Sequence, residues 1–182
     1  MRRFRRVWLL LSLLAAGLLL LSPAAGQRMK RYRDRPEAHG LKYLKDVEKG
    51  VLKLTNKIRR RNGLPVLTNE RRLRRIARNH SKDMLVRDYF GHVNPEGETP
   101  QDRILRDYPY PLEAVGENIW GAEGSEPLET GLLARIIVDT WMSSPGHRRN
   151  ILNPDFTDMG VGVAAFGKRI RATQVFGQIK NR

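Results

Sequence analysis

Three side chains of the types that transfer protons or bind metal ions stand directly behind glycines in this chain. They are His92, Glu117 and His147, which follow Gly91, Gly116 and Gly146. Glycine lets the backbone turn sharply, and Pro145 cannot continue the apolar helix that leads into it. The pattern therefore predicts that His147 lies at a fixed corner, and it indicates one site built from the three residues.

The chemistry open to such a site is either metal-dependent or metal-free. The two neutral imidazoles of His92 and His147 and the carboxylate of Glu117 make a three-ligand set for zinc. The fourth position is then open for a water whose pKa the metal lowers. No HExxH helix occurs in the chain, so no local motif requires a metal. Without a metal, Glu117 is a candidate base and a histidine a candidate acid.

Two further interpretations give the same residues different roles. Ser143 or Ser144 is a candidate nucleophile beside His147 and Glu117, but no nucleophile elbow precedes either serine. A buried glutamate that accepts hydrogen bonds from histidines and backbone amides also holds loops together without any chemistry. Catalysis, binding and loop pinning therefore all stay open at this stage.

The other two histidines have contexts that favour a structural role or none. His80 lies on the apolar stripe of a predicted helix, between Leu73 and Met84. Such a histidine is more often a hydrogen-bonded core residue than a ligand. His39 lies in residues 26–40, a polar and basic stretch without apolar period that predicts a flexible linker. We expect His39 to be inert.

Helical spacing of apolar residues predicts four helices that position these side chains. They run from Leu41 to Asn62, onward from a cap at Thr68 or Asn69, from Pro100 to about Asp107 behind Thr99, and from Leu128 to about Ser143 behind Ser125. Gly50 favours a kink in the first helix. In the last helix the inward-facing residues are predicted to be Leu133, Ile136, Ile137 and Thr140 or Trp141.

The hydrophobic period changes to two in the last part of the chain. Met159–Phe166 alternates apolar residues with glycines, Gly167-Lys168 predicts a turn, and Ile170–Ile179 predicts a returning strand. The glycines of the first strand predict close approach of another element. Gly116–Trp120 predicts a further extended segment, so helices and strands together indicate an α+β domain.

The N-terminus has the pattern of a secretory signal peptide, residues 1–25. Arginines precede the apolar run Val7–Leu21, and small residues follow at Ser22–Ala25. The run is shorter than the roughly 20 residues that span a bilayer. We expect cleavage near Gly26, export, and no transmembrane span afterwards, with an uncleaved anchor as the alternative. The chain has no cysteine, which excludes disulfides and favours a bacterial source for an exported protein.

The chain is strongly basic. Its 34 basic and 19 acidic residues give a net charge of +15; without residues 1–25 and their four arginines, 30 basic and 19 acidic residues leave +11. Nucleic acid is the usual partner of such a charge. An exported protein, however, meets anionic cell-envelope polymers or lipids first, so we expect those partners and not nucleic acid. A solvated basic face that maintains solubility is the alternative.

Several of the stretches quoted above occur in a fixed order that resembles a known family. In chain order they are Ala77–Met84, Phe90–Gly97, Gly116–Ile119, Trp141–Leu152, Gly160–Val163 and Thr173–Phe176. Together they resemble the bacterial branch of the CAP superfamily, the secreted domains related to cysteine-rich secretory proteins, antigen 5 and plant pathogenesis-related proteins. The resemblance covers about residues 54–179.

This resemblance implies an α-β-α sandwich with a small antiparallel sheet between helices, formed by residues 41–182. It also implies a cleft that gathers His92, Glu117 and His147. Some members of the superfamily bind a divalent metal such as zinc through two cleft histidines with acidic residues beside them. This chain has Arg171 where the animal and plant members carry a histidine, and Met142–Ser144 where they carry a second glutamate.

We therefore expect an exported CAP domain that acts in the cell envelope or extracellular space by binding a ligand or partner. The cleft residues are His92, Glu117 and His147, with His92 and His147 as the candidate zinc ligands. The alternative is a metal-dependent hydrolase of peptides or envelope polymers, in which the same three residues are catalytic.

Overall fold

A computed structural model describes residues 40–108, 112–124 and 128–179 of the chain. These residues belong to one compact unit, Glu37–Arg182. The predicted signal peptide, His39 and the predicted cap Ser125 lie outside the described residues. None of the helices in the described part is both long and apolar enough to cross a bilayer.

A five-stranded sheet forms the middle layer of this unit. Its strands are β1 Lys42–Tyr43, β2 Thr68–Asn69, β3 Val115–Glu123, β4 Asp158–Phe166 and β5 Arg169–Gly177. The order β1-β4-β5-β3 places β1 and β3 at opposite edges, and all these neighbours are antiparallel. Only the short β2 pairs in parallel, with β4. The period-two prediction is confirmed, with β4 and β5 joined at Gly167-Lys168.

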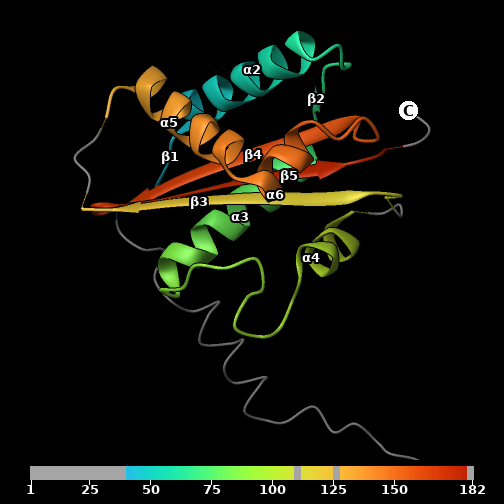
Figure 1. Cartoon of the computed structure of the whole chain (residues 1–182). Coiled ribbons are helices and arrows are strands. Elements are labelled where there is room, and N and C mark those ends of the chain that lie inside the picture. Colours follow the sequence, from blue (N-terminus) through green and yellow to red (C-terminus); the bar gives the residue numbers. More distant parts are fainter. Residues whose placement is uncertain (1–39, 109–111, 125–127, 180–182) are drawn as a thin grey trace, which may run out of the picture. The chain divides into compact units, whose positions relative to one another are not determined.

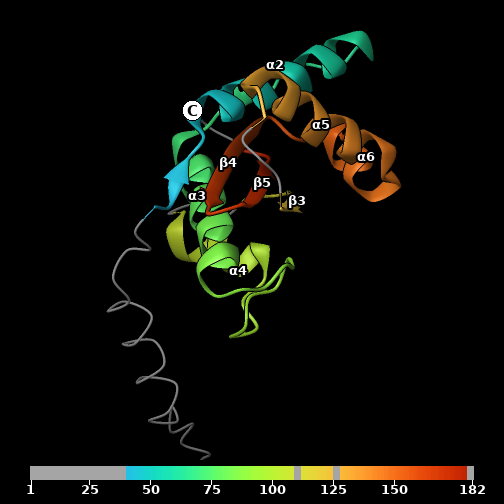
Figure 2. The same cartoon turned by 90° about the vertical axis from the view of Figure 1, so that its left-hand side faces the viewer.

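Helices cover both faces of the sheet, which confirms the predicted α-β-α sandwich. They are α2 Lys45–Arg61, α3 Arg71–Val86, α4 Pro100–Asp107, α5 Thr130–Ser143 and α6 Pro145–Ile151. In Figures 1 and 2, α2 and α5 lie on one side of the sheet, and α3 and α4 lie on the other.

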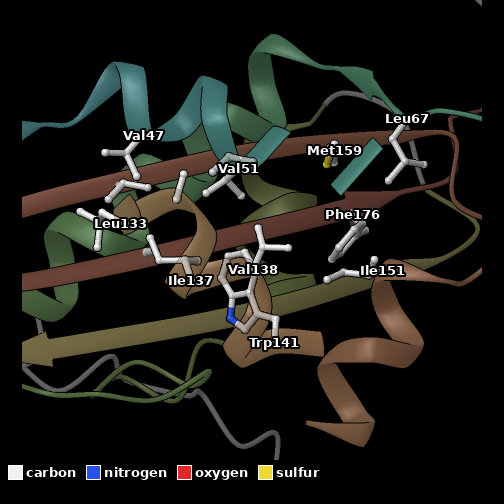
Figure 3. Packing of buried hydrophobic residues seen from close by; sticks show 14 of the residues in the cluster. Val47, Val51, Leu67, Leu133, Ile137, Val138, Trp141, Ile151, Met159 and Phe176 are labelled. Atoms are coloured by element: carbon white, nitrogen blue, oxygen red, sulfur yellow. The ribbon is translucent and has the colours of Figure 1, made fainter. Parts of the chain in front are cut away.

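The larger part of the core lies between the sheet and the α2–α5 pair. Trp141 and Ile137 of α5 pack there with Val51 of α2 and Phe176 of β5 (Figure 3). A smaller apolar cluster on the opposite face joins Leu73 and other α3 residues to α4 and β5. Of the two alternatives predicted to face inward from α5, Trp141 is fully buried and Thr140 is exposed, so the prediction is confirmed for Trp141 and wrong for Thr140.

Several helix ends differ from the sequence predictions. Thr68 and Asn69 pair with β4, and the cap of α3 is Glu70, whose side chain accepts from the Leu73 amide. Glu129 caps α5 through the amides of Gly131 and Leu132. A carboxylate is as good an acceptor as a hydroxyl at this position and also suits the helix dipole.

Other local predictions have mixed outcomes. The predicted cap of α4 at Thr99 is confirmed, and the Thr99 amide also donates a hydrogen bond to the Asp102 side chain, which completes a capping box. The helix α2 is continuous through Gly50, so no break occurs there. A Cβ at Gly50 would lie 2.8 Å from the Cβ of Ala134, so this glycine lets α2 and α5 pack closely. The free energy gained by this close packing offsets the lower helix propensity of glycine. The sequence alone does not show such packing.

Candidate functional site

The candidate site is organised by two consecutive residues of the edge strand β3. Side chains alternate between the faces of a strand, so neighbours point to opposite sides. Glu117 contacts His92, from the segment between α3 and α4, and Arg103 of α4. Asn118 instead contacts α6, where its Nδ2 donates to the backbone oxygen of His147 (3.2 Å). The strand therefore holds both halves of the site.

The carboxylate of Glu117 is buried, and both of its oxygens have partners. Oε1 accepts a hydrogen bond from Nδ1 of His92 (2.9 Å), and Oε2 accepts one from Nη2 of Arg103 (2.8 Å). The Glu117 and Arg103 side chains are only 2% and 4% exposed. Arg103 supplies the opposite charge that a carboxylate needs when it is removed from water.

The bond to Glu117 also sets the state of the His92 ring. A carboxylate oxygen only accepts, so Nδ1 of His92 carries a proton, and in the neutral ring the lone pair is therefore on Nε2. The His92 side chain is 45% exposed. His92 therefore offers a fixed imidazole that is open to solvent and backed by a buried carboxylate.

His147 lies beside His92, as the sequence predicted. The two ring centroids are 6.4 Å apart and the ring planes are inclined by 54°. Burial, and then the neighbouring His92, lower the pKa of His147. Its Nδ1 is buried and has no hydrogen-bond partner within the described ranges. His147 sits in the first turn of α6, because Pro145 begins a new helix there and does not merely end α5.

Side chains from α5 and α6 hydrogen-bond to the backbone of β3. Nδ2 of Asn150 donates to the carbonyl oxygen of Glu117 (3.1 Å) and to Oδ1 of Asn118 (2.8 Å). Nε1 of Trp141 donates to the carbonyl oxygen of Ile119 (2.9 Å). These bonds fix α6, and with it His147, against the strand that carries Glu117.

Arg103 is the site residue that sequence reasoning missed. Nothing in its neighbourhood marks it as functional, since it resembles the other basic residues of a very basic chain. The one usable signal in the sequence is its position next to the apolar Ile104 in a short predicted helix. The structure shows that both residues are buried. A charged residue on a buried position needs a partner of opposite charge.

His80 is a hydrogen-bonded core residue, as predicted, but it also borders the site. Its Nε2 lies 3.0 Å from the carbonyl oxygen of Gly91 and 3.8 Å from Oε1 of Glu117. A carbonyl only accepts, so Nε2 is the donor. Burial lowers the pKa of His80 and outweighs the opposing effect of Glu117. The neutral ring thereby holds the residue that precedes His92.

Three residues singled out in the sequence lie apart from this cluster. Oγ of Ser143 donates to the carbonyl of Asp139 in its own helix (2.9 Å), and Ser144 makes no side-chain cap bond to α6. Within the described residues no hydrogen bond joins either hydroxyl to His147 or Glu117, so these contacts give no support to a serine nucleophile. Arg171 pairs with Gly121, four residues along β3 from Glu117, and binds Glu123 (2.6 Å). It therefore does not replace a cleft histidine.

The residues of the site that would hold a divalent metal are the two histidines. Both carboxylate oxygens of Glu117 are engaged, so we place Glu117 behind His92, where metal sites often carry a carboxylate on the other ring nitrogen. Nδ1 of His147 makes no hydrogen bond within the described residues, so this ring nitrogen has no partner from the protein there. Within the described part of the chain, no group of three or more His, Cys, Asp or Glu side chains is arranged to hold a metal ion.

An α-β-α sandwich with a histidine–glutamate cluster at one sheet edge defines the CAP class of domains. The model of the CAP family, described as the cysteine-rich secretory protein family, matches residues 52–176. The chain therefore belongs to the CAP family.

Similar proteins come from several bacteria. The uncharacterized protein YkwD of Bacillus subtilis is 39% identical over 120 residues, which are 66% of this chain and 43% of YkwD. An extracellular protein containing an SCP domain from Bacillus anthracis is 34% identical with a TM-score of 0.60, covering 73% of this chain and 40% of that one. An outer surface protein of Borrelia burgdorferi shares the fold, with 22% identity and a TM-score of 0.65 over 76% of this chain and 98% of that one. The chain thus spans less than half the length of the two Bacillus proteins.

Proposed function

We propose that this CAP domain acts in the cell envelope or extracellular space by binding a ligand or partner through the cleft of His92, Glu117 and His147. The N-terminal pattern of a signal peptide supports export. So does the similarity to a Bacillus anthracis protein that is described as extracellular.

In this proposal His92 and His147 hold a divalent metal such as zinc. The observation that carries it is the 2.9 Å bond from Nδ1 of His92 to Glu117, because it leaves Nε2 as a lone-pair donor. The lowered pKa of His147 keeps that ring in the neutral form that metals require. Bound zinc would supply a Lewis acid to which an oxygen or nitrogen of the ligand could coordinate.

Calorimetric titration with zinc chloride tests the site. Replacing either His92 or His147 by alanine should lower the zinc affinity at least about tenfold, because a two-histidine site loses half of its protein ligands. Glu117→Gln should also weaken binding by on the order of tenfold, the effect typical of a lost outer-shell partner. His39→Ala is the matched control and should bind as the unaltered chain does. Equal affinity in all five proteins would refute the metal site.

The alternative function is a metal-dependent hydrolase of peptides or envelope polymers. The geometry that favours it is the same Glu117–His92 pair, which leaves Nε2 of His92 to hold a metal that would activate a water. A turnover assay on peptide and polymer substrates separates the two functions. Activity that is lost with chelator and with Glu117→Gln would establish the hydrolase, whereas ligand capture without turnover would support the binding domain.

A further inference from the structure

One side of α3, beside the sheet edge formed by β1, carries arginines that the histidine site does not use. Arg71, Arg74, Arg75 and Arg78 stand at i, i+3, i+4 and i+7, the spacing that places side chains on one helix face. With Tyr43 and Asn79 they line a hollow of about 300 Å³. We call these four residues the arginine stripe.

Close backbone packing fixes the direction of the arginine stripe. A Cβ at Gly160 would lie 2.0 Å from the backbone nitrogen of Arg74, and one at Gly162 would lie 2.2 Å from that of Arg78. The backbone of α3 therefore rests directly on β4, and its apolar side is buried in the core. The helix has no room to roll, so the arginine stripe keeps its position beside β1 and β4.

Most of the positive charge in the stripe is not neutralised by neighbours. Arg78 pairs with Glu48 through three hydrogen bonds and lies 5.5 Å from the ring centroid of Tyr43. Arg75 makes a long bond to the backbone oxygen of Asp107 (3.4 Å). Within the described residues no carboxylate pairs with Arg71, Arg74 or Arg75. Like charges at these spacings destabilise a helix, and a bound anion would relieve that repulsion.

The arginine stripe is separate from the histidine cleft. Tyr43, which borders the hollow, belongs to β1 at one edge of the sheet. Glu117 belongs to β3 at the opposite edge. An anion in the hollow would therefore leave His92 and His147 unobstructed.

We infer that the arginine stripe binds a polymer that carries repeated phosphate groups. The planar guanidinium group matches phosphate with two parallel hydrogen bonds. From Arg71 to Arg78 the helix rises about 10 Å, which is longer than a single phosphate and suits several in a row. This inference requires only the charges of α3, and it is independent of the proposed metal site.

The surroundings of the stripe favour a polymer over a membrane surface. A flat bilayer does not enter a hollow, whereas a chain does. Proteins that dock on membranes usually insert apolar side chains beside their basic ones. The large apolar residues that are exposed in the described part of the chain all lie outside α3, at Val66, Phe90, Val93, Leu105, Leu128 and Leu132. Within the described residues, α3 itself therefore presents no large exposed apolar side chain.

Binding of the full chain to linear inorganic polyphosphate tests the inference, with chelator present so that the histidine cleft plays no part. The variant Arg71→Gln/Arg74→Gln/Arg75→Gln should lose on the order of tenfold in affinity, because charge-assisted hydrogen bonds are lost. The matched control Arg60→Gln/Arg61→Gln/Arg135→Gln removes three exposed arginines from α2 and α5. This control changes the net charge by the same amount. Its affinity for polyphosphate should fall at most about twofold, because only the long-range attraction is weaker. Binding of the unaltered chain should also weaken with salt, as binding to polyanions does.

Each other result overturns the inference. If both triple variants lost the same affinity for polyphosphate, the net charge alone would attract the polymer. If neither variant lost affinity, the arginine stripe would take no part in binding. Inorganic phosphate that binds as tightly as polyphosphate would mean a site for one phosphate. Vesicles of phosphatidylglycerol in phosphatidylcholine that bind more tightly than polyphosphate would mean a membrane partner. Glutamine has nearly the helix propensity of arginine, so the stripe variant should melt at or above the temperature of the unaltered chain.

Discussion

Arg103 gives the buried Glu117 its charge partner and thereby keeps the His92 ring in place. The two charged groups are almost completely shielded from water. Removing one partner of a buried ion pair leaves the other charge without compensation, which costs more than losing both. The guanidinium of Arg103 donates hydrogen bonds to Glu117 and to the carbonyl oxygen of Glu98. Its Nε has no partner within the described residues.

Arg103→Met should therefore lower the free energy of unfolding by about 3 kcal/mol, because it leaves a buried unpaired carboxylate. Adding Glu117→Gln to that variant should restore part of the loss. Urea unfolding of the two single variants and the double variant measures this coupling. Strictly additive losses would show that the two side chains do not interact.

The buried His80 makes stability depend on pH. Burial lowers its pKa, and Arg103 adds to this effect, while Glu117, the Gly91 carbonyl and Asp83 oppose it. Tyr89 also lies against the ring, with its hydroxyl donating to Asp83 (2.6 Å). The folded chain then binds a proton at His80 less readily than the unfolded chain does. The contribution of His80 to the free energy of unfolding is fully present above the ordinary histidine pKa of about 6.5. It falls as the pH drops from there toward the lowered pKa of the folded state.

Urea unfolding at pH 7.5 and pH 5.5 should show this loss in the unaltered chain. His80→Gln keeps a donor for the Gly91 carbonyl but does not titrate, so its stability should depend less on pH over this range. His147 contributes in the same direction and should retain part of the dependence. The control His39→Ala should behave as the unaltered chain, and an unchanged slope in His80→Gln would exclude His80 as the source.

At the scale of elements, the contact between β4 and α3 holds the domain together. The glycines at 160 and 162 leave no space between strand and helix. Ser81 of α3 strengthens the contact, since its hydroxyl donates to the carbonyl oxygen of Gly162 (2.9 Å). Because α3 carries both His80 and the arginine stripe, this contact positions parts of two sites.

Gly162→Ala should destabilise the domain by roughly 3 kcal/mol, because a methyl group there meets backbone atoms that cannot move aside cheaply. Gly146→Ala is the matched control, since its Cβ would have no neighbour closer than 3.9 Å. It lies in a helix, where alanine is favoured over glycine by up to about 1 kcal/mol. Thermal unfolding of the two variants should show shifts of opposite sign, and similar shifts would argue against the close contact.

At the scale of the whole molecule, the sequence predicts most of the architecture and only part of the site. Periodicity located the β4–β5 hairpin and the helices, because each element buries one face and leaves a repeating pattern in the chain. The three site residues could be named from local motifs. The role of Arg103 and the hydrogen bond of Ser143 within its own helix could not be predicted, because both depend on contacts that no local motif displays. The role of Glu117 behind His92 likewise depends on a partner from a segment distant in sequence.

The hydrogen bonds from Trp141 and Asn150 to β3 have a further consequence for self-association. An edge strand offers free carbonyl and amide groups to which a second copy of the chain can add its own strand, and this is a common route to aggregation. Here the carbonyl oxygens of Glu117 and Ile119 already accept bonds from side chains of α6 and α5. The side chains that hold His147 in place thus also occupy two acceptors of this edge, which leaves fewer groups to which a second copy could add a strand.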